Sequence, residues 1–413
     1  MRVAALAAAA VVIALLALRV RETSRAPAEK VTTDAPSTAA APEESAAPGP
    51  IAPPAKPDDE AREAARAERA GVDASNFYKD AFVLFEALTD AEKKMLANPS
   101  EEVDADAAAA LFEKIQPIME LLRRAAAADF CEWGIGPIAF DTPMPHLQKG
   151  RDLGKLALWN AAYRLPTDAA GAIDDLAVRG RLGHHLADAL IGLLVQVSFD
   201  RGATSLLRDH AATLDAASAA KAVEFLGQST IMENVQRAMD MEAAAIATFG
   251  ERLLGSGAEA RQHLTSALSG GGQDAPPAEV QALLDDPARL RAELAYTQQM
   301  EARMAEAMQL PDAQFQSWWS ALEAELREGH PLAAQLVPAI GSVHARLQQT
   351  RIEREMLTAG LAILHSGQAE VARFRDPVTG AQFRYVPQAG GFELQSSYQA
   401  KGKPVAMRFA APQ

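Results

Sequence analysis

The segment FRDPVTGAQFRYVPQAGGFELQSSY, residues 374–398, has a different pattern from the chain before it. The preceding residues are rich in Ala and Leu at helical spacing, whereas here apolar residues alternate with polar ones between turn residues. Alternation with a period of two places every second side chain on one face of a strand. It occurs in three runs, which contain Phe383 and Tyr385, Phe392 and Leu394, and Val405, Met407 and Phe409. The sequence therefore predicts a mainly α-helical protein, a multi-helix array or bundle, that ends in a small antiparallel β-meander.

The predicted meander needs turns and a surface to pack on. Asp376-Pro377 with Gly380 is typical of an entry turn, while PQAGG (387–391) and the region of Gly402 are typical of hairpin turns. Three short strands with one apolar face are not stable alone. We therefore expect that face to pack on the preceding helix, at residues 354–364.

The C-terminal segment also differs from the rest of the chain in charge. Residues 371–413 contain six Lys or Arg and two acidic residues, so this segment carries +4 and the rest of the chain carries −18. One interpretation is that a basic module docks on an acidic body. The alternative is a contact surface for an anionic partner, such as an envelope protein, through the basic residues Arg375, Arg384, Lys401 and Lys403.

Composition excludes several classes of function. With 413 residues the chain can form one large or two ordinary domains. Its net charge of −14 repels nucleic acid, so no nucleic-acid partner is expected. Cys131 is the only cysteine, which excludes an intrachain disulfide and a cysteine-rich zinc site. Phosphate-loop, dinucleotide-binding and serine-nucleophile motifs do not occur in a usable context, and no cofactor is predicted.

The N-terminal region predicts a membrane attachment. Residues 3–18 are an unbroken apolar run that would span roughly 24 Å as a helix, slightly short of the hydrocarbon core of a bilayer. We favour an uncleaved anchor within residues 1–22; a signal peptide cleaved near Ala26-Pro27-Ala28 and a buried helix are the alternatives. Basic residues on both flanks leave the orientation open. The Pro/Ala-rich residues 23–59 predict a disordered linker, with the body on the periplasmic side of the cell membrane.

Residues 60–370 predict a helical domain. Thr89 and Glu92 have the spacing of a capping box. Apolar residues recur at the helical period in two stripes: Phe77, Ala81, Phe82, Phe85 and Leu88, then Leu111, Ile115, Ile118, Met119 and Leu122. Further helices are expected at about 146–164, 169–199, 216–254, 278–309, 311–328 and 331–366, the last broken or bent near Pro338. Within them, the apolar run 189–199 is expected to lie in the centre of the core.

The pattern DPxTGxxFxY followed by GGFxLxS resembles the C-terminal segment of uncharacterised exported helical proteins of planctomycete-type bacteria. A weaker match is CEWG at 131–134. The resemblance implies an envelope protein without assigned catalytic residues. The tail is also similar to the C-terminal part of type II secretion pseudopilins, but the start of the chain lacks the glycine and glutamate of a processed pilin. The residues that carry the main resemblance are Asp376, Pro377, Thr379, Gly380, Phe383, Tyr385, Gly391, Phe392, Leu394 and Ser396.

Two groups of residues could carry chemistry. His184 and Asp188 are four residues apart, a spacing that can chelate a metal on one helical face, but two ligands do not make a metal site. The simpler interpretation is one packed and one solvated histidine in the pair at 184 and 185. Cys131 could be a nucleophile with His146 or His184 as its base, although a thiol beside Phe130 and Trp133 is more often packed.

Aromatic and sulfur-containing residues give further candidates. Trp318 and Trp319 are adjacent, so one is expected to face the core and the other a groove or interface that could bind a partner. Met300, Met304 and Met308 are expected in the core. The sequence thus predicts a membrane-anchored cell-envelope protein with a non-catalytic structural or binding role. The alternative is a hydrolase built around Cys131, His146 and His184.

Overall fold

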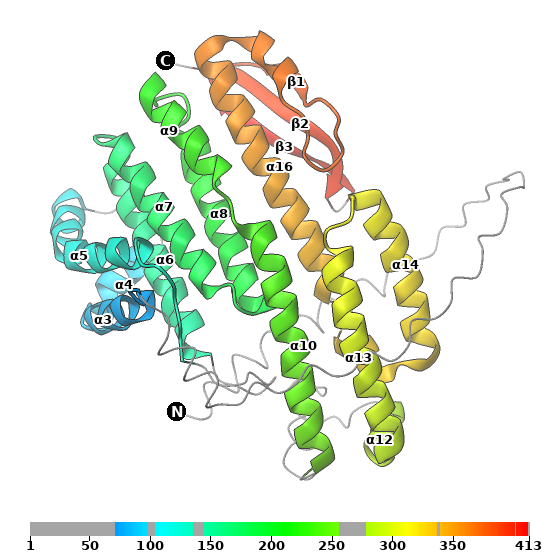
Figure 1. The fold of residues 1–413 in the computed structure, drawn as a ribbon. Helices are drawn as coiled ribbons and strands as arrows, with labels where there is room; N and C mark the ends of the chain where they lie inside the picture. Colours follow the sequence, from blue (N-terminus) through cyan, green and yellow to red (C-terminus); the bar gives the residue numbers. More distant parts are fainter. Residues whose placement is uncertain are drawn as a thin grey trace, which may run out of the picture.

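The computed structural model describes residues 71–97, 104–134, 144–255, 278–336, 339–400 and 402–411. The predicted membrane segment, the predicted linker, the first residues of the predicted helical domain and Lys401 lie outside these ranges. The described chain is mainly helical and ends in a three-stranded antiparallel sheet, which confirms that part of the predicted fold class (Figure 1).

The elements follow one another along the chain with short connections. Aspartates begin five of the helices, because the side chains of Asp73, Asp104, Asp168, Asp215 and Asp286 accept hydrogen bonds from first-turn N–H groups. The helices are α3 (Ala74–Glu86), α4 (Asp90–Ala97), α5 (Ala105–Ala126), α6 (Pro145–Arg164), α7 (Ala169–Leu186), α8 (Leu190–His210), α9 (Ala216–Gly227), α10 (Ile231–Gly255), α12 (Ala278–Leu284), α13 (Pro287–Ala307), α14 (Asp312–Gly329), α15 (Pro331–Leu336) and α16 (Ala339–Ser366). The short helix η1 (Gln368–Arg373) leads to the strands β1 (Arg384–Gln388), β2 (Gly391–Ala400) and β3 (Lys403–Ala410).

Three of the predicted helices are divided in the structure. The segment 169–199 is not one helix, because the chain leaves α7 after Leu186 and enters α8 at Leu190. A Cβ on Gly192 would lie 1.9 Å from the Leu186 carbonyl oxygen, so only glycine permits this close return of the backbone. The predicted helices 216–254 and 278–309 are likewise each two helices. At the first break, mostly good helix formers continue across the junction, so periodicity gives little sign of it. The other two breaks do carry local signals, Gly227 with Ser229 and Thr230, and Asp286 before Pro287, which the apolar periodicity alone does not register.

The helices form a layered array in which α16 contacts α8 and α9, and α10 contacts both α8 and α13 (Figure 1). The helices α3, α4 and α5 lie at one end, against α6 and α7. Among the described residues, α8 is the one helix that is long and apolar enough to cross a membrane by length and composition, and 56 % of its apolar window is buried. Its contacts with α7, α10 and α16 confirm the predicted core position of residues 189–199.

Buried charges cross the centre of this array. Arg354 of α16 donates from Nη1 to Oδ2 of Asp200 on α8 at 2.7 Å, and its Nη2 donates to the carbonyl oxygens of Phe225 and Leu226. Arg179 of α7 donates to the Gly154 and Phe199 carbonyl oxygens. The side chains of the three charged residues are almost completely buried. Because these charges are paired or hydrogen-bonded, they fix how α7, α8 and α16 lie relative to one another.

The C-terminal sheet has the strand order β1-β2-β3 and packs on α16, as predicted. The turns contain Gly390 and Gly402, whose φ angles of 79° and 73° favour glycine. Gly360 of α16 allows close packing, since a Cβ there would lie 2.1 Å from the Phe409 ring. The buried face of the sheet consists of Phe392, Leu394, Ser396, Tyr398, Val405, Met407 and Phe409.

Residues of the DPxTG pattern hold the entry to the sheet. The buried Asp376 carboxylate accepts hydrogen bonds from the N–H groups of Val378 and Thr379 at 2.7 and 3.0 Å. It also accepts from the Ser396 hydroxyl on β2. Asp376 thus closes its own turn and ties that turn to the sheet, a structural role for two residues of the pattern.

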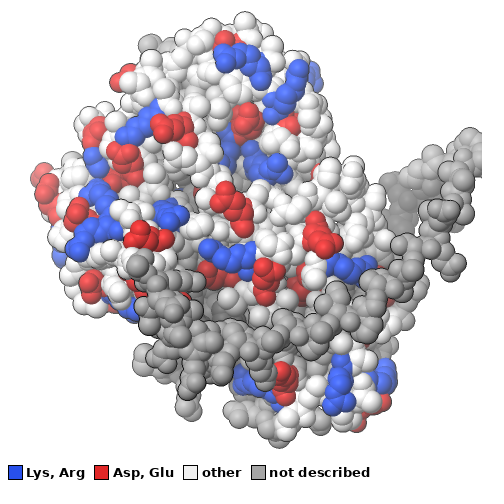
Figure 2. All heavy atoms as spheres, in the orientation of Figure 1, with Lys and Arg blue, Asp and Glu red and all other residues white. Residues whose placement is uncertain are grey.

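The described contacts between the segment and the body are mainly apolar. Its described ion pairs, Arg373–Glu370 and Arg408–Glu393, lie near or within the segment itself. Whether the basic charge of the segment also favours its docking on the acidic body stays a prediction. On the face shown in Figure 2, acidic and basic side chains are interspersed over the whole body.

Candidate functional site

A polar cleft of about 230 Å³ lies where the segment after α5 meets the end of α7 and the side of α10. It brings together Cys131, His184 and Asp188, three of the residues predicted from the sequence, but not His146. The complete lining is Asp129, Phe130, Cys131, Arg181, His184, His185, Asp188 and Arg237.

Backbone hydrogen bonds hold the segment with Cys131 against the start of α3. The Ala74 N–H donates to the Phe130 carbonyl oxygen at 2.8 Å, and the Val72 N–H donates to Asp129 Oδ2 at 2.8 Å. The Glu132 N–H donates to Asp73 Oδ1 at 3.0 Å. Asp73 therefore both begins α3 and fixes this wall of the cleft.

Trp133 anchors the same segment to the helices. Its ring stacks on Tyr78 with centroids 5.3 Å apart, and its Nε1–H donates to the His185 carbonyl oxygen at 2.8 Å. Trp133 also contacts His146, with ring centroids 5.0 Å apart. His146 is buried beside this tryptophan and is absent from the cleft lining.

Arg237 of α10 caps the end of α7. It donates from Nη2 to the His184 carbonyl oxygen at 2.6 Å and lies 3.3 Å from Asp188 Oδ1 through Nε. A cation at this position interacts favourably with the negative end of the helix dipole. Asp188 is therefore paired with Arg237, and His184 Nδ1 lies 3.1 Å from the Thr230 hydroxyl. No group of three metal-ligating side chains occurs among the described residues.

The pKa values of Cys131 and of the two candidate histidines do not favour a thiolate–imidazolium pair. Burial, with the charges of Asp73 and Asp188, raises the pKa of Cys131 well above its ordinary value. Burial, with the charges of Arg237 and Arg181, lowers the pKa of His184 to about 4. Burial also lowers the pKa of His146 to about 4. At neutral pH the thiol is therefore protonated and the imidazoles are neutral. No hydrogen bond joins Cys131 to a histidine in the described part of the chain.

His185 is the most buried polar side chain of the cleft, with 5 % of its surface exposed. Its Nδ1 lies 2.9 Å from the Tyr78 hydroxyl, and its Nε2 is buried without a hydrogen-bond partner among the described residues. Burial, with the charge of Arg181, lowers the pKa of His185 to about 3. His185 is thus the packed histidine of the pair, whereas His184 is partly buried and bonded to Thr230, neither fully packed nor fully solvated.

Arg181 is the one cationic lining residue without a hydrogen bond or ion pair in the described structure. It precedes His185 by four residues, so the two side chains lie on the same face of α7. This spacing was a signal that sequence reasoning missed. Arg237 could not be found in this way, because it comes from another helix.

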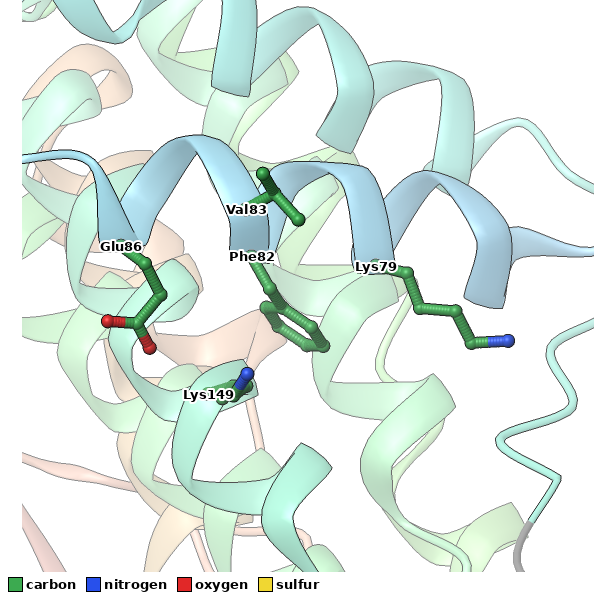
Figure 3. A pocket seen from close by; sticks show the side chains of 5 residues that line it. All are labelled: Lys79, Phe82, Val83, Glu86 and Lys149. Carbon is green, nitrogen blue, oxygen red and sulfur yellow. The ribbon is translucent and has the colours of Figure 1, made fainter.

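A second hollow, of about 390 Å³, lies between α3 and α6 (Figure 3). Lys79, Phe82, Val83, Glu86 and Lys149 line it, and Lys149 Nζ lies 5.6 Å from the centroid of the Phe82 ring. Val83 is 70 % exposed. The lysines and the glutamate surround an apolar floor and do not converge on one point, so this hollow is not a catalytic candidate (Figure 3).

The remaining predicted binding residues lie far from the cleft in the chain and line neither hollow. Trp318 and Trp319 both contact Phe315, each with ring centroids 6.0 Å apart, and both are partly buried. Whether one of them faces a groove or an interface stays a prediction. Arg375, Arg384 and Lys403 are exposed, and a partner for this basic surface stays a prediction.

Comparison with known proteins gives no relative. No protein-family model matches the chain, no curated protein matches its sequence, and no solved structure matches its fold.

Proposed function

We propose that this protein is a membrane-anchored protein of the cell envelope with a non-catalytic binding role, and that its binding site is the cleft at the end of α7. Membrane attachment is supported by the apolar run 3–18 and the Pro/Ala-rich residues 23–59. The binding role is supported by the polar groups of the cleft.

The main support for a binding role is that two polar groups of the cleft lack hydrogen-bond or ion-pair partners, while the groups around them are held in place. Arg181 has no partner in the described structure, and His185 Nε2 is buried without one. Around them, Arg237, Asp188 and His184 are held by hydrogen bonds or ion pairs. Burying an unpaired polar group is unfavourable, and a bound ligand would supply the missing partner.

The hydrolase alternative is less well supported by the same cleft. A cysteine nucleophile requires a thiolate, which a neighbouring cation or an imidazolium normally stabilises. Here the pKa of Cys131 is raised by burial and by two carboxylates, so the thiol stays protonated at neutral pH. The contacts of Trp133 with Tyr78 and His185 give the segment around Cys131 a packing role.

The test uses the full-length protein purified in detergent and its thermal unfolding in the presence of small carboxylates, phosphates, amines and sugars. A ligand that binds only the folded state raises the melting temperature. We expect at least one class to do so in the wild type but not in Arg181→Gln, and the compound to be recovered unchanged. Arg151→Gln, which removes an exposed arginine from α6, is the matched control.

Two results would contradict the proposal. One is a panel in which no class changes the melting temperature of the wild type. The other is conversion of a compound to a product that Cys131→Ser abolishes, which would favour the hydrolase.

A further inference from the structure

We propose that the cleft binds a small, singly charged carboxylate, which accepts hydrogen bonds from the Arg181 guanidinium and from the Nε2–H of His185. This inference rests on the binding function proposed above and names the class of its ligand.

First, the contact with Tyr78 determines the tautomer of His185. The Tyr78 side chain is buried, and its hydroxyl has one described hydrogen-bond partner, Nδ1 of His185 at 2.9 Å. If Nδ1 carried the proton, the tyrosine hydroxyl proton would be buried without an acceptor, which costs free energy. The tyrosine therefore donates to Nδ1, and the proton of the neutral imidazole is on Nε2.

The second step is that this Nε2–H lacks an acceptor. Nε2 is buried without a partner among the described residues, and His185 belongs to the lining of the cleft. A buried N–H donor of this kind is normally satisfied by a protein acceptor, an ordered water or a ligand. A hydrogen-bond acceptor inside the cleft would therefore satisfy the Nε2–H donor of His185.

The third step is the charge of that acceptor. Arg181 lies one helical turn before His185, and its positive charge is close enough to lower the pKa of both His184 and His185. Its guanidinium has no described partner, whereas Arg237 is already paired with Asp188. An arginine in this state is suited to the planar, two-pronged hydrogen bonding of an oxyanion.

The fourth step distinguishes a carboxylate from a phosphate. The lining also contains Asp129 and Asp188, and because Asp188 is paired with Arg237, the charges left are those of Arg181 and Asp129. The carboxylates of the lining repel a doubly charged phosphate more strongly than a monoanion, so the single positive charge of Arg181 suits a monoanion better. The volume of about 230 Å³ is below the usual range of drug-sized pockets, so the ligand should be small.

The experiment is a calorimetric and NMR titration of the full-length protein in detergent with acetate, propionate, inorganic phosphate and methylammonium at constant ionic strength. We expect acetate or propionate to bind the wild type. We also expect Arg181→Gln to weaken this binding about tenfold or more, the usual effect of losing a charge-assisted hydrogen bond. Arg181→Lys should retain part of the affinity, because it keeps the charge, and Arg151→Gln should retain all of it.

The possible failures are distinguishable. If phosphate or methylammonium binds in an Arg181-dependent manner and the carboxylates do not, the carboxylate inference is wrong and the proposed binding function stands. If no probe binds and no compound of the thermal unfolding experiment changes the melting temperature, both proposals are wrong. Carboxylate binding that is equal in Arg181→Gln and in the wild type would overturn the inference, since the anion would then bind elsewhere.

Discussion

Replacing Asp200 by Asn tests how the centre of the helical array is held together. Asp200 and Arg354 are 5 % and 7 % exposed, and the pair has an N–O distance of 2.7 Å. The carboxylate also accepts from the Ser229 hydroxyl at 3.1 Å. Asparagine keeps the shape but removes the charge, which leaves the buried guanidinium of Arg354 without a counter-ion.

The expected cost is large. Removing one partner of a buried ion pair typically costs about 3 to 5 kcal/mol. The loss should be near the upper end of that range, because Arg179, 5 % exposed, lies close to the same carboxylate. The carbonyl oxygens of Phe225 and Leu226 still accept from Arg354 and offset part of the loss.

The assay is chemical denaturation of the full-length protein, followed by circular dichroism. The matched control is Glu353→Gln, which removes the partly exposed Arg201–Glu353 ion pair and should cost less than about 1 kcal/mol. The double variant Asp200→Asn, Arg354→Met should recover much of the stability, since the Arg354 charge is then gone and Arg179 keeps its hydrogen bonds to the Gly154 and Phe199 carbonyl oxygens. A loss below about 1 kcal/mol in Asp200→Asn would refute the argument that this pair holds α8 against α16.

Three further predictions concern stability. Burial lowers the pKa of His344 to about 4 and that of His185 to about 3, so below pH 6.5 the unfolded state binds more protons than the folded state. The free energy of unfolding should therefore decrease as the pH falls from about 6.5 to 4. A denaturation midpoint that does not change over this range would contradict the prediction. Burial, with the charge of Glu242, raises the pKa of Glu301 to about 8, so stability should also fall as pH rises from about 5 to 8; Glu301→Gln should remove that slope, and a slope that persists in it would have another origin. Leu394→Ala opens a cavity between the sheet and α16 and should lower the free energy of unfolding by about 2 to 5 kcal/mol, whereas Gln388→Ala, at an exposed position, should lower it little. Equal losses in the two variants would mean that packing of the sheet on α16 does not stabilise the protein.

The elements that local signals specify could be predicted from the sequence. The alternation around Phe392 and Met407 indicated the strands, and the Thr89–Glu92 capping box is present, with the Thr89 N–H donating to Glu92 at 2.7 Å. Met300 and Met304 are buried as expected. These signals depend on neighbours along the chain, which a sequence displays directly.

The parts that depend on distant residues could not be predicted. Asp200 and Arg354 are 154 positions apart, and nothing near either residue indicates a buried partner. The break between α7 and α8 follows from the close approach of Gly192 to Leu186, a tertiary contact in a stretch of good helix formers.

The cleft also combines residues that the sequence identifies with contacts that it does not show. Cys131, His184 and Asp188 were each identified as candidates, but which of them share a site depends on how the segment after α5 packs on α7. The role of each group then depends on its environment, because burial and nearby carboxylates make Cys131 a poor nucleophile. Residue type alone left both a packed and a nucleophilic thiol open.

The most direct test of the binding site is histidine NMR of the full-length protein with ¹⁵N-labelled imidazoles, assigned by comparison with His185→Gln. At pH 7 the account predicts a neutral His185 with its proton on Nε2, and a displacement of the Nε2 resonance when acetate is added to the wild type but not to Arg181→Gln. A proton on Nδ1, or an Nε2 resonance that acetate leaves unchanged, would contradict the assignment of His185 and Arg181 as the ligand-binding groups.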